Sequence, residues 1–358
     1  MLIYIFLIIF LIIFSTYNNI KNKKLLIFFF IIFWIMATFR NLDIGNDTRN
    51  YYFLYKEICN SSKIQNMTWR YEIGYLLINK LISLFTSNFT IFLGIINIYI
   101  YIIYYKFIKN YSLNYIFSTF LFLTLGIWGK TVNILRLELA IIIVLTGFLL
   151  KEKNKKWMGI LLSFFGILFQ RISIVYLLSF FIPKKISKNF YIISALLVII
   201  LFLNFNIFIN LVAQIFPYFK IYLSESSSYK IGDLKIATVI SIFKAFFIFL
   251  FGIITYFKSN RALYSKKENQ DFLYQINMVY TEFLILFTSL QFNLLDRCSY
   301  YFSIFEILMI PNAVKRLNKN EKIICIILVL TICVIYFFII ILLKSEWNRL
   351  VPYKTIFS

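Results

Sequence analysis

The chain has 358 residues, of which 61% are hydrophobic, and its mean hydropathy is +0.82. This composition excludes an ordinary soluble protein, in which about half of the residues are apolar. The chain has no histidine, which excludes histidine-based acid–base chemistry and histidine metal ligands. The formal net charge of +22 does not indicate a nucleic-acid partner, because the lysines lie in short loops between apolar runs, as the positive-inside rule expects.

Many continuous apolar runs approach the length needed to cross a bilayer. They predict an all-α, polytopic membrane protein with about 12 membrane segments. A membrane barrel would instead show short alternating strands. We expect one integral membrane domain over residues 1–358, with these apolar runs: 2–14, 25–39, 89–105, 115–128, 132–150, 157–182, 190–212, 236–257, 272–290, 300–310 and 323–343.

The longest polar stretch in the first half of the chain, residues 40–72, follows the second run. It contains acids and arginines, which a bilayer core would exclude, and a cluster of aromatic residues. The following run, residues 73–85, is short and carries Asn79 and Lys80, so we expect an interfacial helix rather than a span. Residues 40–88 are therefore predicted to form an extracytoplasmic cap.

The polar pair Gln170-Arg171 interrupts the apolar run 157–182 near its middle. This interruption predicts a broken or re-entrant pair of short helices. With the loop 21–24 in the cytoplasm, such a pair brings every basic loop to the cytoplasmic side, as the positive-inside rule requires. Two further segments then lie on the extracytoplasmic side: residues 213–235 and the tail 344–358.

The arginines and lysines differ in their predicted distribution. Most of the cytoplasmic charge is lysine, whereas seven of the nine arginines lie at or near the outer side. The planar guanidinium fork suits phosphate and carboxylate groups, so this face is predicted to bind an anionic ligand. The alternative is that these arginines neutralise nearby acids and lipid phosphates. The seven are Arg40, Arg49, Arg70, Arg136, Arg171, Arg297 and Arg349.

Arg136 and Glu138 lie early in the run 132–150. Residues two apart do not face each other on a helix, so each needs its own partner or a hydrated cavity. A charge within a membrane segment is costly and usually functional. Arg136 is therefore a candidate binding residue, and pairing with an acid of the cap is the structural alternative.

Arg171 and Arg297 are two further candidates. A broken helix exposes backbone groups and is tolerated only beside protein or a water-filled cavity, so Arg171 either binds a ligand or caps the turn. Asp296-Arg297 begins a later helix, where the acid suits the helix N-terminus. Within the cap, Asp47 precedes tyrosines that include Tyr51. A carboxylate can accept a hydroxyl proton, although an amphipathic interfacial helix would carry the same tyrosines.

Six short motifs follow one another along nearly the whole chain. They are Arg40, Gly45, Asp47 and Tyr51; Glu72, Gly74 and Tyr75; Asn133, Arg136 and Ala140; Phe169 and Ser173; Arg297, Tyr300 and Tyr301; and Pro352 and Tyr353. In this order, the motifs resemble those of the EpsG/Wzy-like family of bacterial polysaccharide polymerases. The chain departs from the family at the Phe-His-x-Ser turn, because Gln170 or Arg171 occupies the place of the histidine.

The resemblance implies a membrane glycosyltransferase in the cytoplasmic membrane of a bacterium. It would join oligosaccharide repeat units carried on polyprenyl pyrophosphate, on the outer face of the membrane, into a surface polysaccharide such as O-antigen, capsule or exopolysaccharide. A chain-length regulator and a flippase of the same pathway are the implied partners. We expect no cofactor, and no acidic cluster in the sequence resembles a metal site. A glycan ligase and a lipid-linked glycan translocase remain as alternatives.

On this reading, arginines stabilise the leaving pyrophosphate without a metal ion. Asp47 is the first choice for activating the acceptor hydroxyl, with Glu138 and Glu72 as alternatives. Other polar and aromatic residues are expected to bind the glycan or the pyrophosphate. The predicted substrate-binding residues are Arg136, Arg171, Arg297, Arg40, Gln170, Tyr51 and Tyr300.

Overall fold

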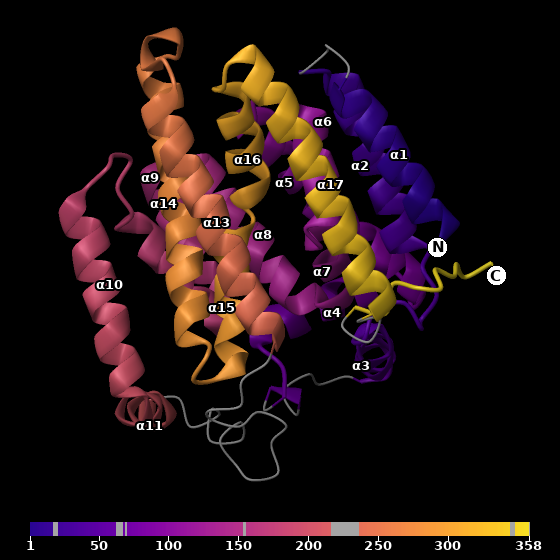
Figure 1. Cartoon of the computed structure of the whole chain (residues 1–358). Coiled ribbons are helices and arrows are strands. Elements are labelled where there is room, and N and C mark those ends of the chain that lie inside the picture. The colour runs from indigo at the N-terminus through magenta and orange to yellow at the C-terminus, as the bar shows by residue number, and fades with distance from the viewer. Residues whose placement is uncertain are drawn as a thin grey trace. The chain divides into compact units, whose positions relative to one another are not determined.

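The computed structural model describes residues 1–16, 21–61, 67–68, 70–152, 155–215, 236–343 and 348–357. Every named element in these ranges is a helix (Figure 1), so the predicted all-α class is confirmed. The chain divides into two compact units, each described here by itself. Unit 1 comprises Met1–Ile174 and Asn318–Ser358, and unit 2 comprises Val175–Leu317.

Unit 1 carries the cap and the first predicted membrane runs. The 3₁₀ helix η3 (Arg171–Phe180) begins in unit 1 and continues into unit 2. The other elements of unit 1 are α1 (Leu2–Thr16), α2 (Lys23–Thr38), α3 (Thr48–Asn60), α4 (Ile73–Ser83), α5 (Phe89–Tyr111), α6 (Tyr115–Thr124), α7 (Ile127–Asn133), α8 (Leu135–Lys151), α9 (Lys156–Phe165), η2 (Gly166–Leu168) and α17 (Lys319–Leu343).

Unit 2 contains the long helices of the second half of the chain. Its elements after η3 are α10 (Lys188–Leu203), α11 (Phe205–Ile215), α13 (Ile236–Lys258), η5 (Arg261–Leu263), α14 (Lys266–Thr288), η6 (Asn293–Leu295), α15 (Asp296–Ser303) and α16 (Glu306–Lys315).

Among the described residues, 3 helices are long and apolar enough to cross a membrane: α5, α13 and α17. The count rises to 5 if each of two bent pairs, α6 with α7 and α10 with α11, is one span. The predicted count of about 12 segments is therefore not confirmed. One reason is that several predicted runs form shorter helices, such as α2 with 16 residues and α8 with 17.

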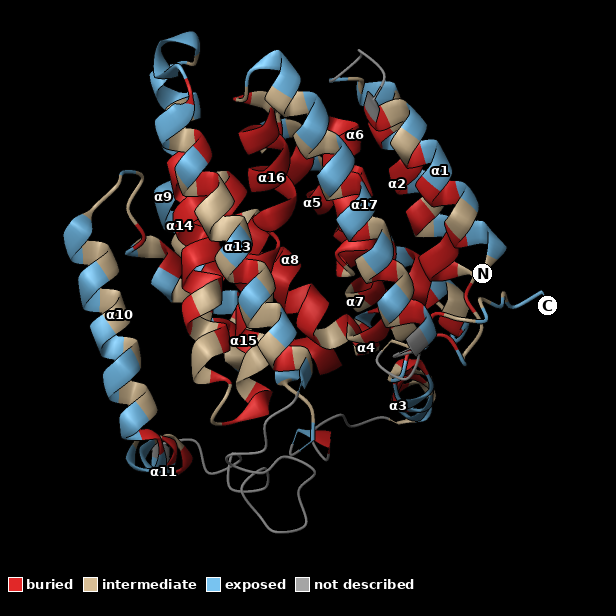
Figure 2. Ribbon diagram, in the orientation of Figure 1, coloured by how far each residue is buried: buried red, intermediate tan, exposed pale blue. Residues whose placement is uncertain are grey.

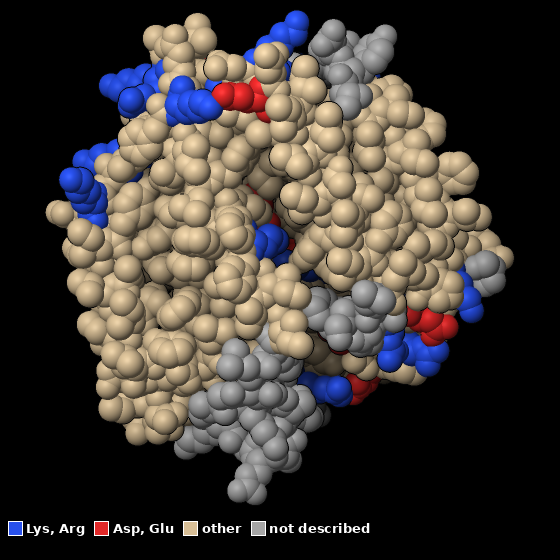
Figure 3. Space-filling model, in the orientation of Figure 1, with Lys and Arg blue, Asp and Glu red and all other residues tan. Residues whose placement is uncertain are grey.

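The helix surfaces are those of a protein surrounded by hydrocarbon. In α10 no residue is buried, and its exposed side chains include Ile193, Leu197 and Ile200 (Figure 2). Most of the surface visible in Figure 3 is formed by uncharged side chains. Exposed apolar area of this extent is unfavourable in water, since each buried Å² of apolar surface contributes about 25 cal/mol. The described helices therefore support a membrane protein.

Two predicted runs are each divided into a bent pair of helices. The run 190–212 bends by 84° at Asn204, where α10 ends. The run 115–128 is divided at Gly126, whose φ of 79° is left-handed and ends α6, and α7 leaves at 55°. A single polar residue or glycine barely lowers the hydropathy of a run, so these bends were not predicted. By contrast, the predicted interruption of the run 157–182 is present at Phe169 and Gln170.

The cap begins where α2 ends. The cap contains helix α3 and, after it, the 11-residue helix α4. At 1.5 Å per residue, α4 is about 16 Å long, well short of the roughly 30 Å hydrocarbon core. Its length agrees with the predicted interfacial helix over residues 73–85. Most of the predicted loop 213–235 lies outside the described residues.

The C-terminal segment, residues 348–357, pairs with the chain that leaves α2. The Asn41 amide donates to the Lys354 carbonyl at 3.0 Å, and the Ile356 amide donates to the Phe39 carbonyl at 3.0 Å. These two hydrogen bonds flank an isolated antiparallel bridge between Arg40 and Thr355. The first residues of the cap are therefore held by the end of the chain.

Gly45 lets the cap loop approach α7 closely. Its φ of 85° is left-handed, and an added Cβ would lie 2.8 Å from Thr48 Oγ1 and 3.0 Å from the Val132 carbonyl oxygen. Gly45 also donates its amide hydrogen to the Arg349 carbonyl at 3.2 Å. Only glycine satisfies both the backbone angle and the contact.

We expect Gly45→Ala to lower the free energy of unfolding by about 2 kcal/mol or more, because backbone strain adds to overpacking. Gly126→Ala is the matched control, since its φ is 79° but no atom lies within 4 Å of the added Cβ; it should cost about 1 kcal/mol. The apparent melting temperatures of the purified variants in detergent measure both effects. Equal shifts for the two variants would contradict the packing argument.

Unit 2 contains a buried charge cluster of its own. Lys244 of α13 lies 2.7 Å from the Glu306 carboxylate and 3.8 Å from that of Glu282 in α14. Both glutamates are almost completely buried. Breaking a buried ion pair typically costs about 3–5 kcal/mol, so the cluster couples α13, α14 and α16. The sequence reading did not identify this cluster.

Candidate functional site

The central contact of unit 1 joins Arg136 to Glu72. The Arg136 Nη1 atom lies 2.9 Å from Glu72 Oε2, and the side chains are 20% and 13% exposed. Arg136 lies in the first turn of α8, where the helix dipole disfavours a cation. The carboxylate of Glu72, the residue just before α4, offsets this charge. The pair is thus partly shielded and still reachable from one side.

Aromatic rings extend this pair. The Arg136 and Arg70 guanidinium carbons each lie 5.4 Å from the centre of the Tyr71 ring. On the other side of the residue, the Arg136 amide is 3.5 Å from the Tyr51 hydroxyl oxygen. Ring faces attract cations, and Tyr71 lies within cation–π range of both arginines.

The interrupted run 157–182, called the broken helix from here on, contacts the same carboxylate. The Arg171 amide nitrogen lies 3.5 Å from Glu72 Oε1, at the start of η3. Glu72 therefore contacts Arg136 with one oxygen and the Arg171 backbone with the other. The Arg171 side chain is exposed. One backbone group freed at the break, the Arg171 amide, thus meets a carboxylate of the cap, in the protein-lined setting that a break within a membrane protein requires.

Glycine makes this meeting of α4 and the broken helix possible. A Cβ on Gly74 would lie 2.7 Å from the Leu168 carbonyl oxygen and 2.9 Å from the Leu168 Cβ. Neither atom can move without moving the backbone of η2. The two segments that flank Glu72 and Arg171 are therefore in direct contact through Gly74.

Asn133 fastens the cap loop to the start of α8. Its Oδ1 atom accepts the Asn46 amide at 2.7 Å, and its Nδ2 atom donates to Asn348 at 3.2 Å. Asn133 is the last residue of α7 and stands three residues before Arg136. The resemblance includes Asn133 in the same motif as Arg136, but Asn133 is not among the predicted site residues.

Arg40 is buried and bonded within the cap. Its guanidinium donates to the Ala37 carbonyl, and its Nε atom lies 3.4 Å from Thr48 Oγ1. Burial lowers the pKa of Arg40 to about 10, so the group stays cationic at neutral pH. The structure gives Arg40 backbone and side-chain partners at the end of α2, and its predicted substrate contact stays a prediction.

Asp47 immediately precedes α3, and its side chain makes no hydrogen bond to the first-turn amides. It is partly exposed. The neighbouring Arg49 forms an ion pair with Asp43, and both side chains are at least half exposed. Exposed pairs contribute at most about 1 kcal/mol, so the 43–49 pair stabilises the loop only weakly.

Glu138 and Arg136 have different partners. It is 1% exposed and accepts a hydrogen bond from the Tyr104 hydroxyl of α5. The expectation that Arg136 and Glu138 need separate partners is confirmed by these contacts. A carboxylate enclosed in this way is poorly placed to meet a bulky sugar hydroxyl.

Gln170 lies in the break itself. It is 9% exposed, and its Oε1 atom has no hydrogen-bond partner among the described residues. Arg297 and Tyr300 belong to unit 2, where Arg297 follows the first residue of α15 and Tyr300 lies one turn later. Their predicted grouping with Arg136 and Arg171 stays a prediction. In the described part of the chain, no three Cys, Asp or Glu side chains are grouped to hold a metal ion.

The contacts of unit 1 thus define a partly exposed site built by α4, α8 and the broken helix, with arginines, a carboxylate and a tyrosine. A protein-family model described as the EpsG family matches residues 23–355. The chain belongs to the EpsG family. No curated protein and no solved structure matches the chain.

Membership of the EpsG family indicates a role in polysaccharide polymerisation at a membrane. The matched range contains every predicted site residue of both units, and it reaches the C-terminal segment that holds the cap. The apolar surfaces of the helices agree with the membrane setting of the EpsG family.

Proposed function

We propose that this protein joins oligosaccharide repeat units carried on polyprenyl pyrophosphate into a surface polysaccharide. The observation that carries the proposal is the contact of Glu72 with both Arg136 and the Arg171 backbone. This contact brings an arginine and a carboxylate together in one partly exposed site, which supports a reaction with an anionic leaving group and an acceptor hydroxyl. Family membership supports the same class of reaction.

The reaction is a displacement at the anomeric carbon of the donor sugar. The acceptor hydroxyl oxygen forms a bond to this carbon, and the bond from the carbon to the pyrophosphate oxygen breaks. The bonding electrons remain on the pyrophosphate, and the hydroxyl proton moves to a carboxylate. The protein must therefore stabilise a growing negative charge and accept one proton.

Arg136 is the residue we assign to the growing charge. Its guanidinium is always protonated and offers a planar fork to phosphate oxygens. Stacking on Tyr71 at 5.4 Å fixes its orientation. Arg171, and Arg297 of unit 2, are proposed as further pyrophosphate ligands, and metal-independent catalysis follows from this use of arginines.

Glu72 is the residue we assign to the proton. Pyrophosphate competes with the carboxylate for Arg136, so donor binding loosens the pair at 2.9 Å. The released carboxylate then faces the acceptor hydroxyl. This exchange favours Glu72 over Asp47, the first choice from sequence, and over the enclosed Glu138.

The remaining predicted residues are proposed to shape the glycan site. Arg40 holds the cap, and Tyr51 packs edge-on against Tyr75 at 5.9 Å between ring centres. Tyr300 and Gln170 are proposed glycan contacts. We further propose that the cap faces the outside of the cytoplasmic membrane of a bacterium, where a flippase delivers the donor and a chain-length regulator acts on the product.

Gly74→Ala tests the contact of α4 with the broken helix. The added Cβ forces α4 from Leu168, and a displacement of about 1 Å at a reacting centre can cost up to about 10²-fold in rate. We expect polymer synthesis to fall about tenfold or more. Gly94→Ala is the control, because its Cβ meets only the Thr38 methyl at 3.3 Å. Equal activity of both variants would show that the approach of α4 is unimportant.

The lipid-linked glycan pool of a deletion strain tests the proposed function. A polymerase predicts single repeat units that accumulate on the outer leaflet. Complete polymer retained on the lipid would instead indicate a ligase, and single repeats trapped on the inner leaflet would indicate a translocase. Either result would overturn the proposal. Complementation by the wild-type gene must restore the polymer in each case.

A further inference from the structure

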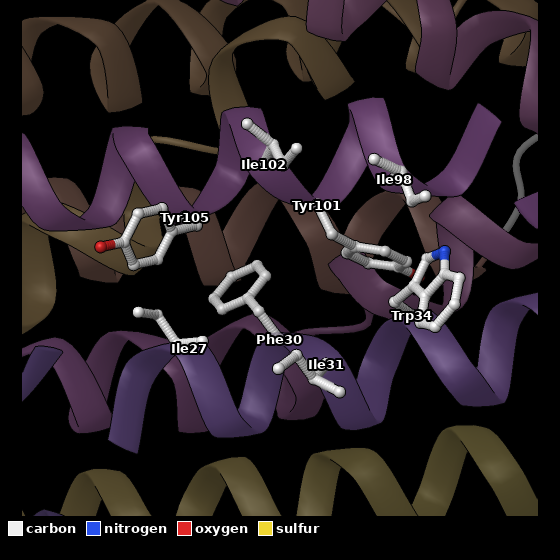
Figure 4. A pocket seen from close by; sticks show the side chains of 8 residues that line it. All are labelled: Ile27, Phe30, Ile31, Trp34, Ile98, Tyr101, Ile102 and Tyr105. Carbon is white, nitrogen blue, oxygen red and sulfur yellow. The ribbon is translucent and has the colours of Figure 1, made fainter. Parts of the chain in front are cut away.

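An apolar groove with a volume of about 380 Å³ runs between α2 and α5, within unit 1 (Figure 4). Its lining follows the i, i+3, i+4, i+7 spacing of one helix face on both helices. The lining residues are Ile27, Phe30, Ile31 and Trp34 of α2, and Ile98, Tyr101, Ile102 and Tyr105 of α5.

The groove has an aromatic floor and an aliphatic rim. Phe30 and Tyr101 are 5% and 3% exposed, whereas the four lining isoleucines are 44–49% exposed. At one end the Trp34 Nε1 atom donates to the Gly94 carbonyl at 3.1 Å, which ties the two helices together. A rim of this kind is stable only where hydrocarbon covers it.

The length of the groove limits its occupant. It extends over eight residues of each helix, from Ile27 to Trp34 and from Ile98 to Tyr105, which is about 10 Å along a helix axis. The hydrocarbon core of a bilayer is about 30 Å thick, so one leaflet supplies about 15 Å. The groove therefore suits a lipid chain of one leaflet and is too short for a path across the membrane.

Lysines mark the other end of the groove. Tyr105 lies beside Ile27 and Ile98 lies beside Trp34, so the helices run antiparallel (Figure 4). Lys23 precedes Ile27 by four residues, and Lys109 follows Tyr105 by four residues, with its ammonium 5.5 Å from the ring centre. Residues four apart lie on the same helix face, so both lysines extend the groove.

Two further lysines belong to this end. Lys24 and Lys106 are exposed and lie in the first turn of α2 and the last turns of α5. Four ammonium groups beside an apolar groove complement a phosphate headgroup joined to a hydrocarbon chain. Each lysine near a membrane surface contributes about a fivefold preference for anionic lipid.

We propose that this groove is a binding site for an anionic glycerophospholipid. One acyl chain lies along the isoleucine rim over Phe30 and Tyr101, and the phosphate lies between Lys106, Lys109 and the lysines of α2. The donor lipid of the proposed reaction is not the occupant, because its pyrophosphate is assigned to Arg136, which pairs with Glu72 of the cap, and the cap follows the opposite end of α2 from these lysines. Only this exclusion rests on the proposed function; the apolar groove and the lysines at its end carry the site without it.

Fluorescence quenching of Trp34 tests the site in the full-length protein. The protein is placed in phosphatidylcholine nanodiscs that contain either brominated phosphatidylglycerol or brominated phosphatidylcholine, and Trp34→Phe identifies the signal of Trp34. We expect brominated phosphatidylglycerol to quench Trp34 at a mole fraction at least about fivefold lower. The double variant Lys106→Gln, Lys109→Gln should remove this preference. Lys319→Gln with Lys322→Gln, on α17, should leave it unchanged.

A second pair of variants tests the groove itself. Ile102→Phe fills the groove and should abolish quenching of Trp34 by both lipids, whereas Ile95→Phe, one turn beyond the lining, should not. The proposal is overturned if both brominated lipids quench Trp34 equally or if the lysine variants keep the preference. It is also overturned if polyprenyl phosphate displaces brominated phosphatidylglycerol more effectively than unlabelled phosphatidylglycerol does. The substituted lysines lie at helix ends, so these variants remain informative even if Ile102→Phe does not fold.

Discussion

Arg136→Ala should reduce polymer formation by about 10²- to 10³-fold, the usual effect of removing one preorganised group that stabilises developing negative charge. The structure holds the Arg136 guanidinium through Glu72 at 2.9 Å and the Tyr71 ring. Arg136→Lys should recover only part of the activity, because an ammonium keeps the charge but not the bidentate fork. The amount and length of polymer, at equal protein level, are the measurements.

Arg49→Ala is the matched control for Arg136→Ala. Like Arg136, Arg49 forms an ion pair with an acid of the cap, but both members of its pair are at least half exposed. We expect less than a threefold change, since such pairs contribute little. If Arg136→Ala made as much polymer as Arg49→Ala does, the only role of Arg136 would be to pack α8 against the cap.

Glu72→Gln should lower the rate by about 10²- to 10⁴-fold, the range reported for loss of a general base. Glutamine keeps the size of the side chain and an acceptor oxygen for the Arg171 amide, so α4 and the broken helix stay in place. The ability to take the acceptor proton is lost. Turnover by the purified protein should therefore fall, while its affinity for the lipid-linked donor stays equal or rises, because no carboxylate then competes with the pyrophosphate for Arg136.

Asp47→Asn and Glu138→Gln complete this comparison. Asp47 precedes α3 without capping it, and Glu138 is enclosed beside Tyr104. Both variants should keep activity within about tenfold of wild type, a span worth about 1.4 kcal/mol. Loss of turnover in Asp47→Asn with normal turnover in Glu72→Gln would restore Asp47 as the proton acceptor and reduce Glu72 to a residue that positions Arg136.

Some of the architecture is readable from composition and polar interruptions. The pair Gln170-Arg171 interrupts an apolar run, and the structure has a helix break at this point. The Arg171 amide, which the break frees, lies near the Glu72 carboxylate. The bends at Gly126 and Asn204 are different. Each bend depends on one residue whose effect on hydropathy is small, so the hydropathy profile shows no interruption at that residue.

The candidate site was only partly predictable for a related reason. Helix geometry alone requires separate partners for Arg136 and Glu138, and the structure supplies Glu72 and Tyr104. Which acid of the cap meets Arg136 depends on tertiary packing between residues 64 positions apart. The contact through Gly74 that brings α4 to the broken helix leaves no periodic pattern in the sequence.

The most direct test is a reconstituted reaction. The purified full-length protein in liposomes is given lipid-linked single repeat units as the only glycan, and the products are separated by length, with Arg136→Ala as the parallel sample. The account predicts a ladder of longer lipid-linked glycans and one released polyprenyl pyrophosphate per bond formed, both absent with Arg136→Ala. Repeat units that remain single with wild-type protein, or a ladder that persists in Arg136→Ala, would contradict it.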